Sequence, residues 1–430
     1  MKSWFTGRWM WLSSLHQLWL KWSRLYIREL PQIMIARFRY RHRLREVRSA
    51  LMSRKLRVLF PVSNHSKWKM QTVFDLMRLS KVFEPVILLT AMDTESTLDV
   101  DELRIHLGRI RREFDQLQMK CVCGYDFEKG VCIPVAAFKP DIVFYQQPYG
   151  IANVQDPFVA SRVALTCYVP YFVQNYGGLD MDCDLFFHRL LWRHFTLSPS
   201  WAEAFENYQG SVRRAGRVLG LGHPMLDQLG NSNTEGAEPG FVIYAPHWSC
   251  GGIGERYSTF LGNGEKMLAL ARRHPEIRWV FKPHPTLRQK LIEHHFMAPE
   301  QIAAYYDAWG KIATSCYDGG YVDLFNRSSV MITDCASFLV EYASTGKPII
   351  HLVAENPVYQ PHPISAKLFN TYYQAHDWGE FEKYFETVVL QGLDPKHDVR
   401  IAAVKELNLM GTKAGERIVS YLKVILGVQE

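Results

Sequence analysis

The sequence lacks several features that would place it in a familiar class. It contains no uninterrupted apolar stretch of about 18 residues, so no membrane-spanning helix is expected. Its 8 cysteines form no Cys-x-x-Cys pair and keep no regular spacing to histidine, which predicts reduced, cytosolic thiols and neither a disulfide framework nor a zinc site. Repeats of fixed period are absent, and no cluster of carboxylates points to an obligatory metal. We therefore expect no cofactor.

Acidic residues are scarce at the N-terminus alone. Residues 1–57 hold 14 Lys and Arg against 2 Asp and Glu, whereas the rest of the chain holds 36 basic and 41 acidic residues. The net charge of +7 therefore comes from the N-terminal segment, and the body is mildly acidic. The overall basic balance consequently says little about any site in the body.

The N-terminal segment, residues 1–55, combines tryptophan with arginine. Apolar side chains follow helical spacing from Phe5 to Tyr26, and "RFRYRHRLREVR" (Arg37–Arg48) follows. Polar residues interrupt the apolar part and no small-residue cleavage site is evident, so a signal peptide is not expected. This pattern favours a basic amphipathic helix on an anionic membrane surface, over packing on its own domain or another subunit and over nucleic-acid binding. Removal of residues 1–55 is then expected to leave the fold intact.

The body alternates short apolar runs with helical patterns. Examples are "LRVLFPVS" (56–63), "EPVILLT" (84–90), "FVIYAPHW" (241–248) and "KPIIHL" (347–352). Such alternation predicts parallel sheets covered on both faces. A run rich in Gly, Asn, Ser and Glu near residues 228–240 reads as a linker.

The predicted architecture is therefore α/β, with two Rossmann-like domains facing a cleft after the N-terminal helical segment. Their expected bounds are 56–228 for an acceptor domain and 240–400 for a nucleotide-donor domain, with a C-terminal helix in 401–430. Ligands of parallel sheets bind outside the carboxyl ends of the strands, which places the site between the domains.

One strand end carries polar residues at a turn into a helix. Ser329–Thr333 is predicted as a buried strand, and Thr333 or Asp334 is expected to cap the next helix through a side-chain oxygen. Ser337 would lie in the first turn, with Glu341 one turn on. A helix N-terminus binds anions, so these residues suit a nucleotide: hydroxyls for a phosphate and Glu341 for a ribose hydroxyl. Capping and packing alone is the other interpretation.

Two further strand ends place histidine beside proline. In "FKPHP" (281–285), Lys282 and His284 stand on a turn that the prolines stiffen, and both suit a phosphate oxygen. "YAPHWS" (244–249) repeats the design with His247 and Ser249, and the glycines that follow could bring backbone N–H groups close to a phosphate. Polar strand ends repeated in this way favour a binding site over packing.

Together these motifs resemble the CDP-glycerol glycerophosphotransferase family, the enzymes of teichoic-acid and related capsule synthesis. The residues that carry the resemblance are "YAPHW", "FKPHP", "GHPMLD" (222–227) and "YVDLFNRSSVMITDCASFLVEYASTGKPII" (321–350). Their order and spacing, more than any one motif, make the likeness. The resemblance implies a GT-B-like fold, a CDP-alditol donor such as CDP-glycerol, and CMP as leaving product.

The resemblance also implies a role for individual residues. Those matching family positions around the nucleotide and its phosphates are Lys282, His284, Thr333, Ser337 and Glu341. The Trp-His-Gly triplet of the teichoic-acid polymerase branch is missing; the comparable strand end reads "YVPYFVQNYGG" (168–178). The general base is therefore open between His65, in "PVSNHSKW" (61–68), and His247.

The expected function is transfer of glycerol phosphate, or a related polyol phosphate, to a hydroxyl of a glycan or lipid-linked acceptor. The enzyme would work in the cytoplasm, peripherally on the inner face of the cell membrane, without nucleic acid. Two alternatives stay open: a GT-B glycosyltransferase with a CMP- or UDP-sugar donor, and a non-catalytic membrane scaffold. The alditol, the acceptor, the number of units added and the oligomeric state, a homo-oligomer included, are not determined by the sequence.

Overall fold

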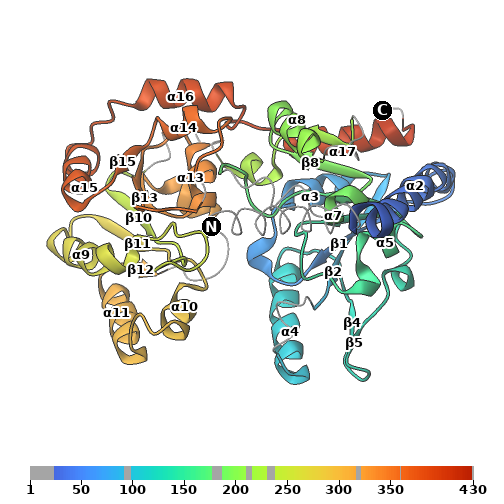
Figure 1. The fold of residues 1–430 in the computed structure, drawn as a ribbon, viewed down its shortest axis with the longest axis horizontal. Helices are drawn as coiled ribbons and strands as arrows, with labels where there is room; N and C mark the ends of the chain where they lie inside the picture. The colour runs from blue at the N-terminus through green and yellow to red at the C-terminus, as the bar shows by residue number, and fades with distance from the viewer. Residues whose placement is uncertain are drawn as a thin grey trace, which may run out of the picture.

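The computed structural model describes residues 24–91, 98–176, 186–209, 216–229, 238–315, 321–358 and 360–428. They form two lobes side by side, each built around a parallel sheet with helices on its faces (Figure 1). The α/β class predicted from the alternation of apolar runs and helical patterns is present in both lobes. The tryptophan-rich residues 1–23 and most of the predicted linker, residues 230–237, lie outside the described part.

The first sheet has seven strands in the order β3-β2-β1-β6-β7-β8-β9, and every neighbouring pair is parallel. Its central strands are buried almost throughout, as expected of continuous apolar runs in a sheet covered on both faces. The strands are β1 Leu56–Val62, β2 Phe83–Leu89, β3 Cys121–Cys123, β6 Ile142–Tyr145, β7 Leu165–Tyr168, β8 Arg193–Thr196 and β9 Val218–Gly220. A small antiparallel hairpin lies apart from this sheet, β4 Tyr125–Asp126 with β5 Val131–Cys132.

The second sheet has six parallel strands in the order β12-β11-β10-β13-β14-β15. These strands are β10 Phe241–Ala245, β11 Arg278–Phe281, β12 Thr314–Ser315, β13 Val330–Thr333, β14 Ile349–Leu352 and β15 Tyr373–Ala375. In both sheets the chain starts in the middle, runs to one edge, then returns to run to the other edge. The strand order therefore reverses between β1 and β6 in the first sheet and between β10 and β13 in the second. Such switch points are where open α/β sheets bind ligands.

Helices cover both sheets (Figure 1). Those of the first lobe are η1 Arg24–Glu29, α2 Leu30–Ala50, η2 His65–Lys67, α3 Gln71–Leu79, α4 Val100–Gln116, η4 Val135–Phe138, η5 Asn153–Gln155, α5 Pro157–Ala160, α7 Phe186–Leu190, α8 Pro199–Tyr208 and η7 Pro224–Gln228. Those that follow are α9 Phe260–Arg273, α10 Leu287–Glu293, α11 Pro299–Ile312, α12 Val322–Arg327, α13 Ala336–Ala343, α14 Ala366–Phe369, α15 Trp378–Tyr384, η9 Phe385–Leu390, α16 His397–Glu406 and α17 Ala414–Leu426.

Helix α2 packs against the first lobe along one side. Ile33, Ala36, Tyr40 and Val47 are buried in the same core as β1, and the Tyr40 hydroxyl donates to the carbonyl oxygen of Leu190 at 2.8 Å. The expectation that residues 1–55 can be removed without harm is therefore wrong, because this helix supplies core side chains. Its opposite side is exposed and carries both apolar and arginine side chains.

After α16 the chain crosses back from the second lobe, and the last helix, α17, lies on the first lobe (Figure 1). The Asp227 carboxylate, from the "GHPMLD" motif, accepts from the backbone N–H groups of Ala414 and Gly415 at 2.8 and 2.7 Å. It also accepts from the hydroxyls of Thr72 in α3 and Thr412. An acidic side chain at a helix N-terminus complements the helix dipole. This part of the motif thus fastens the C-terminal helix to the first lobe.

The two lobes are also joined next to the second switch point. The segment after β7 reaches the second lobe, where the Asn175 side-chain amide donates to the carbonyl oxygen of Ala336, the first residue of α13. The next ring, Tyr176, stacks on Tyr257 with 4.6 Å between ring centroids. Buried apolar side chains of α8 join the same cluster as those of β10 and β13. The carboxyl ends of the two sheets are consequently held near each other.

Candidate functional site

The second switch point is built on the carboxyl ends of β10 and β13. Asp334, directly after β13, accepts from the backbone N–H of His247 at 2.5 Å and from the N–H and hydroxyl of Thr259 at 2.6 and 3.0 Å. Burial raises the pKa of this carboxyl to about 6. The predicted capping role is therefore wrong for Asp334: its carboxylate ties the segment after β10 to the segment before α9. The residue before α13 is Cys335, which makes no side-chain capping hydrogen bond.

Thr333 and Ser337 flank the start of α13. The Thr333 hydroxyl is buried; it donates to the carbonyl oxygen of Ala245 at 2.7 Å and accepts from the N–H of Cys335 at 2.9 Å. Thr333 therefore shapes the turn instead of facing a ligand. Ser337 is partly exposed in the first helical turn, as predicted, 3.7 Å from the sulfur of Cys335. Of the two hydroxyls, Ser337 is the one placed to meet a ligand at the helix N-terminus.

His247 lies on the other side of the switch point. Its Nδ1 lies 2.8 Å from the hydroxyl of Ser249 and accepts from the Ser249 N–H at 3.3 Å. The Ser249 hydroxyl also accepts from the N–H of Tyr257 at 3.0 Å. Ser249 is fully buried, so its hydroxyl orients the imidazole and is used inside the protein, unlike the phosphate contact expected from the sequence.

His284 repeats this arrangement at the end of β11. Its Nδ1 accepts from the N–H of Thr286 at 3.3 Å and lies 2.9 Å from that residue's hydroxyl. The imidazole of His223, in "GHPMLD", makes the same bond to the N–H of Met225, and its Nε2 then lies 2.8 Å from the carbonyl oxygen of Pro170. A nitrogen that accepts from an N–H carries no proton, so in the neutral ring the proton is on Nε2.

His247 and His284 therefore each present an Nε2–H donor. Their ring centroids lie 5.2 Å apart. Burial holds the pKa of His247 well below its usual range, and burial together with the Lys282 ammonium lowers the pKa of His284 to about 4. Both rings are neutral at pH 7 and offer a hydrogen-bond donor instead of a basic nitrogen. Of the two histidines that the sequence offers as general base, His65 is therefore the better candidate.

Lys282 is the cation of this group. It is 4 % exposed, and its Nζ lies 5.9 Å from the ring centroid of Tyr321. Among the described residues its ammonium has no hydrogen-bond or ion-pair partner. A buried ammonium without a counter-charge is costly, and such groups usually mark a place where an anion binds.

A second lysine, which the sequence reasoning did not single out, reaches the site from the first lobe. Lys69, 6 % exposed, follows β1 and donates from Nζ to the Tyr321 hydroxyl at 2.6 Å, which in turn donates to the carboxylate of Glu341. Glu341 is buried, and its burial raises its pKa while Lys69 opposes that shift. Glu341 therefore acts as counter-charge across the two lobes, and its predicted ribose contact stays a prediction.

Lys69 and Lys282 interact electrostatically. Each lies near the Tyr321 ring, Lys69 at 4.5 Å from its centroid, and the Lys282 charge contributes to lowering the pKa of Lys69 after the larger effect of burial. Glu341 offsets the charge of Lys69, so among these three groups the Lys282 ammonium remains as one excess positive charge. Together with the N-terminus of α13 and the two imidazole N–H donors, this charge favours a bound phosphate or diphosphate.

His65 lies apart from this group, in the short helix η2 after β1 at the first switch point. Its Nδ1 is 3.6 Å from a carboxylate oxygen of Glu113 in α4, and its ring packs on Phe114 with 5.0 Å between centroids. Its Nε2 is buried, and no described residue gives it a hydrogen-bond partner. Burial lowers the pKa of His65, with Glu113 opposing the shift and Lys69 adding to it. A neutral imidazole backed by a carboxylate suits proton abstraction through Nε2.

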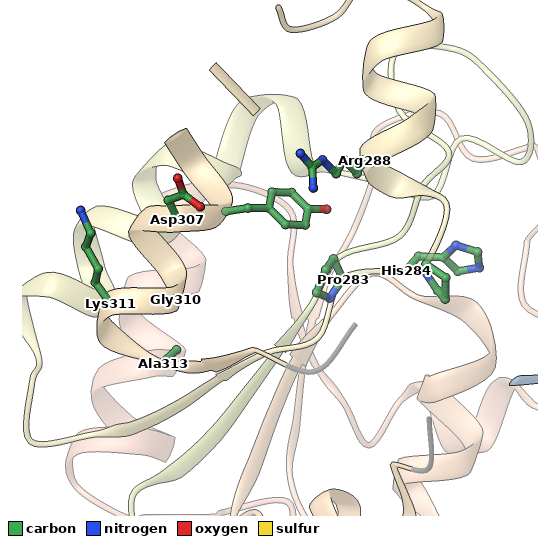
Figure 2. Close-up of a pocket in the computed structure, with 9 residues that line it drawn as sticks. Pro283, His284, Arg288, Asp307, Gly310, Lys311 and Ala313 are labelled. Atoms are coloured by element: carbon green, nitrogen blue, oxygen red, sulfur yellow. The ribbon is translucent and has the colours of Figure 1, made fainter. Parts of the chain in front are cut away.

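A pocket of about 740 Å³ lies beside the end of β11, next to His284. Figure 2 shows Arg288 and Asp307 bordering it, whereas the His284 ring turns away from Asp307 and Lys311. Of the nine residues predicted for the site, His284 alone borders this pocket. The described residues that line it are Pro283, His284, Pro285, Arg288, Tyr306, Asp307, Gly310, Lys311 and Ala313. A mainly apolar pocket with a few charged side chains at its border, adjoining the Lys282–His284 turn, is suited to the part of a ligand that extends beyond the phosphates.

Comparisons with known proteins agree with the motif analysis. Residues 197–373 match the model of the family described as CDP-Glycerol:Poly(glycerophosphate) glycerophosphotransferase. The minor teichoic acid biosynthesis protein GgaB of Bacillus subtilis (strain 168) is 25 % identical over 108 residues, which are 25 % of this chain. The match spans 10 % of the length of GgaB.

Solved structures with a similar fold cover most of the chain. The wall teichoic acid polymerase TagF, as a histidine-to-asparagine variant soaked with CDPG, has a TM-score of 0.52 at 9 % identity, and the match covers 94 % of this chain and 98 % of the TagF chain. A UDP-N-acetylglucosamine 2-epimerase of Listeria monocytogenes has a TM-score of 0.53 at 12 % identity, covering 87 % and 98 %. MnaA of S. aureus with UDP has 0.53 at 15 %, covering 87 % and 98 %.

At these identities the likeness to solved structures shows the fold alone, and it confirms the predicted GT-B-like arrangement of two Rossmann-like lobes. The family model covers the segment from the end of β8 to the start of β15, which contains Lys282, both imidazole turns and α13. The family resemblance inferred from the motifs is thereby confirmed for residues 197–373, which match the family model.

Proposed function

We propose that the chain transfers glycerol phosphate, or a related polyol phosphate, from a CDP-alditol to a hydroxyl of a glycan or lipid-linked acceptor and releases CMP. The observation that carries the proposal is the Lys282 ammonium, buried without a partner among the described residues at the end of β11. Its excess charge matches a nucleoside diphosphate, and the family match of residues 197–373 supports a CDP-alditol as the form of that ligand.

The donor diphosphate would lie between Lys282, the Nε2–H groups of His247 and His284, and the first turn of α13 with Ser337. These groups are neutral or positive donors and are held in place before the ligand arrives, which is the arrangement that stabilises charge in a transition state. The pocket bordered by Arg288 and Tyr306 would receive the nucleoside portion (Figure 2). Asp334 and Ser249 hold His247 without touching the ligand.

In the proposed reaction the acceptor oxygen attacks the distal phosphorus of the CDP-alditol. A bond forms between that oxygen and the phosphorus, the bond from phosphorus to the bridging oxygen breaks, and CMP leaves with the bonding electron pair. The acceptor proton passes to Nε2 of His65, while Glu113 stabilises the imidazolium that forms. Lys282 and the imidazole N–H donors compensate the charge that develops on the departing phosphate.

Attachment to a membrane surface is proposed for the exposed side of α2. Ile27, Met34 and Phe38 are exposed apolar side chains on η1 and α2, and Arg41 and Arg45 follow on the exposed part of the same helix. Apolar side chains with arginines beside them favour the interface of an anionic bilayer. No helix in the described part of the chain is long and apolar enough to cross a bilayer. This interface binding would place the enzyme peripherally at the inner face of the cell membrane.

Ligand-dependent thermal unfolding tests the proposed donor. The full chain is melted with CDP-glycerol, CDP-ribitol, CMP, UDP-N-acetylglucosamine or no ligand. A ligand at 100 times its Kd stabilises by about 2.7 kcal/mol, enough to raise Tm by several degrees. We expect stabilisation by CMP and by at least one CDP-alditol. Stabilisation by the UDP-sugar alone would replace the proposal with a glycosyltransferase, and no stabilisation by any cytidine nucleotide would contradict it.

A further inference from the structure

The first switch point, between β1 and β6, carries a side-chain cluster that the donor site does not use. The segments after these two strands supply Lys67 and Gln147 with Tyr149, and the segment after β7 adds Tyr171. This is the crevice in which an open parallel sheet binds its ligand. It belongs to the opposite lobe from Lys282, so it is a separate subsite.

The cluster is held together by direct contacts. The Lys67 Nζ donates to the side-chain oxygen of Gln147 at 2.9 Å and lies 5.4 and 5.5 Å from the ring centroids of Tyr149 and Tyr171. The two tyrosine hydroxyls lie 2.6 Å apart, and the side-chain amide of Gln147, which is buried, donates to the carbonyl oxygen of Tyr149 at 2.9 Å. The tyrosine rings meet edge to face. Tyr149 is nevertheless 41 % exposed, so this side of the cluster is open to solvent.

Short stretches of chain connect the cluster to residues that contact the donor site. Lys69, two residues after Lys67, reaches Tyr321 in the second lobe, and its N–H donates to the side chain of Gln146, the neighbour of Gln147. Tyr171 precedes Asn175 by four residues, a span of at most about 14 Å, and Asn175 contacts the first residue of α13. A molecule on the tyrosines therefore lies within a short reach of a donor at α13.

We propose that Lys67, Tyr149 and Tyr171 form the acceptor subsite and bind a phosphate-bearing polyol unit of the acceptor chain. The ammonium attracts the phosphate, the tyrosine hydroxyls bond the polyol hydroxyls, and the ring faces cover its C–H groups. This assignment rests on the proposed function, since it explains where the attacking hydroxyl is held. His65 follows β1 in the same loop as Lys67, and so the base and the bound hydroxyl belong to one crevice.

The test is the binding of a synthetic trimer of glycerol phosphate to the full chain saturated with CMP, measured by titration calorimetry or saturation-transfer NMR. CMP keeps the trimer from the phosphate site of the second lobe. We expect the trimer Kd to rise at least tenfold in Lys67→Met and in Tyr149→Ala, and severalfold in Tyr171→Phe, which keeps the ring. The affinity for CMP should stay within twofold in all three variants.

Tyr208→Ala is the matched control, because Tyr208 is similarly exposed, at 46 %, on α8 of the same lobe. It should bind the trimer like the unaltered chain. The subsite is overturned if the unaltered chain does not bind the trimer, if Lys67→Met and Tyr171→Phe bind it normally, or if Lys282→Met abolishes trimer binding. If the chain bound neutral methyl glucoside through Lys67 and the two tyrosines but did not bind the trimer, the proposal that this subsite takes a phosphate-bearing ligand would be refuted.

The two proposals fail separately in this experiment. Trimer binding that depends on Lys67 and Tyr149 in a chain that does not bind CMP would support the acceptor subsite and contradict the proposed donor. Normal CMP binding, together with trimer binding that does not depend on Lys67 or Tyr149, would support the proposed donor and contradict the acceptor subsite. Thermal unfolding of each variant shows whether it is folded. If Tyr149→Ala does not fold, the two separate variants Lys67→Met and Tyr171→Phe still decide the test.

Discussion

Replacing Lys282 by methionine separates a ligand-binding lysine from a structural one. Methionine has a similar volume and no charge, so it removes a buried ammonium that has no partner among the described residues. Burying an unpaired cation costs folding free energy. We therefore expect the free energy of unfolding of the unliganded Lys282→Met protein to be unchanged or higher than that of the original protein.

The same substitution should weaken donor binding strongly. A hydrogen bond to a charged group contributes about 1.5–3 kcal/mol, and 1.4 kcal/mol corresponds to a factor of ten in Kd. The Kd for CMP and CDP-glycerol should therefore rise about 10- to 100-fold. Titration calorimetry measures the affinity, and denaturant unfolding without ligand measures the stability.

Lys347, after α13 in the same lobe, is the matched control. Its Nζ donates to the carbonyl oxygens of Phe325, Asn326 and Ser328 at 2.7, 2.5 and 2.6 Å. Lys347→Met leaves these buried acceptors without their donor, at roughly 1 kcal/mol each, so it should destabilise the protein by about 3 kcal/mol and leave the Kd for CMP nearly unchanged. The reasoning is refuted if Lys282→Met destabilises the unliganded protein by a similar amount while its affinity for CMP is normal.

Three further predictions follow from the site. Burial lowers the pKa of His65, so the acidic limb of the kcat/KM profile should lie below the ordinary histidine value of about 6.5. Glu113 opposes this shift, so the limb should move to still lower pH in Glu113→Gln. A limb that does not move would show that His65 is not the base. Activity should survive EDTA, since Lys282, the imidazole N–H donors and α13 supply the positive charge, and a loss on chelation that magnesium restores would contradict this. Met34→Ser with Phe38→Ser should weaken co-sedimentation with phosphatidylglycerol vesicles at least tenfold, whereas Val424→Ser, which removes an exposed apolar side chain from α17, should not; equal effects would reject the α2 interface.

The fold was readable from the sequence because local signals and the final environment agree. Buried parallel strands need continuous apolar runs, and β1, β10 and β13 have them; Pro246 marks where β10 ends. The same agreement located Lys282 and His284, since a polar residue directly after such a strand has to emerge at the ligand-binding edge.

Contacts between side chains that lie far apart in the sequence could not be predicted from it. Lys69 and Tyr321 meet only because the lobes pack together, although they are 252 residues apart. Asp334 was predicted to cap α13 because capping is the local option for an acidic residue at that position. The carboxylate instead bonds His247 and Thr259, which the fold brings from the segment between β10 and α9. Side-chain roles at this site therefore depend on tertiary contacts that spacing does not encode.

The N-terminal segment shows a third case. Its arginine-rich pattern suggested a helix free to lie on a membrane, yet one side of α2 is buried in the first lobe. An amphipathic pattern gives the apolar side of a helix but not the surface that covers it. Membrane contact through the exposed side of α2 stays a proposal. Residues 1–23 lie outside the described part of the chain.

The central claim is that this chain moves a polyol phosphate from a cytidine diphosphate donor. The most direct measurement follows CDP-glycerol by ³¹P NMR in the presence of the glycerol phosphate trimer, with UDP-N-acetylglucosamine in a parallel sample. The account predicts CMP formed in equal amount to a new phosphodiester on the trimer, both lost in His65→Ala and Lys282→Met. Conversion of the UDP-sugar with no CMP released from CDP-glycerol would contradict it.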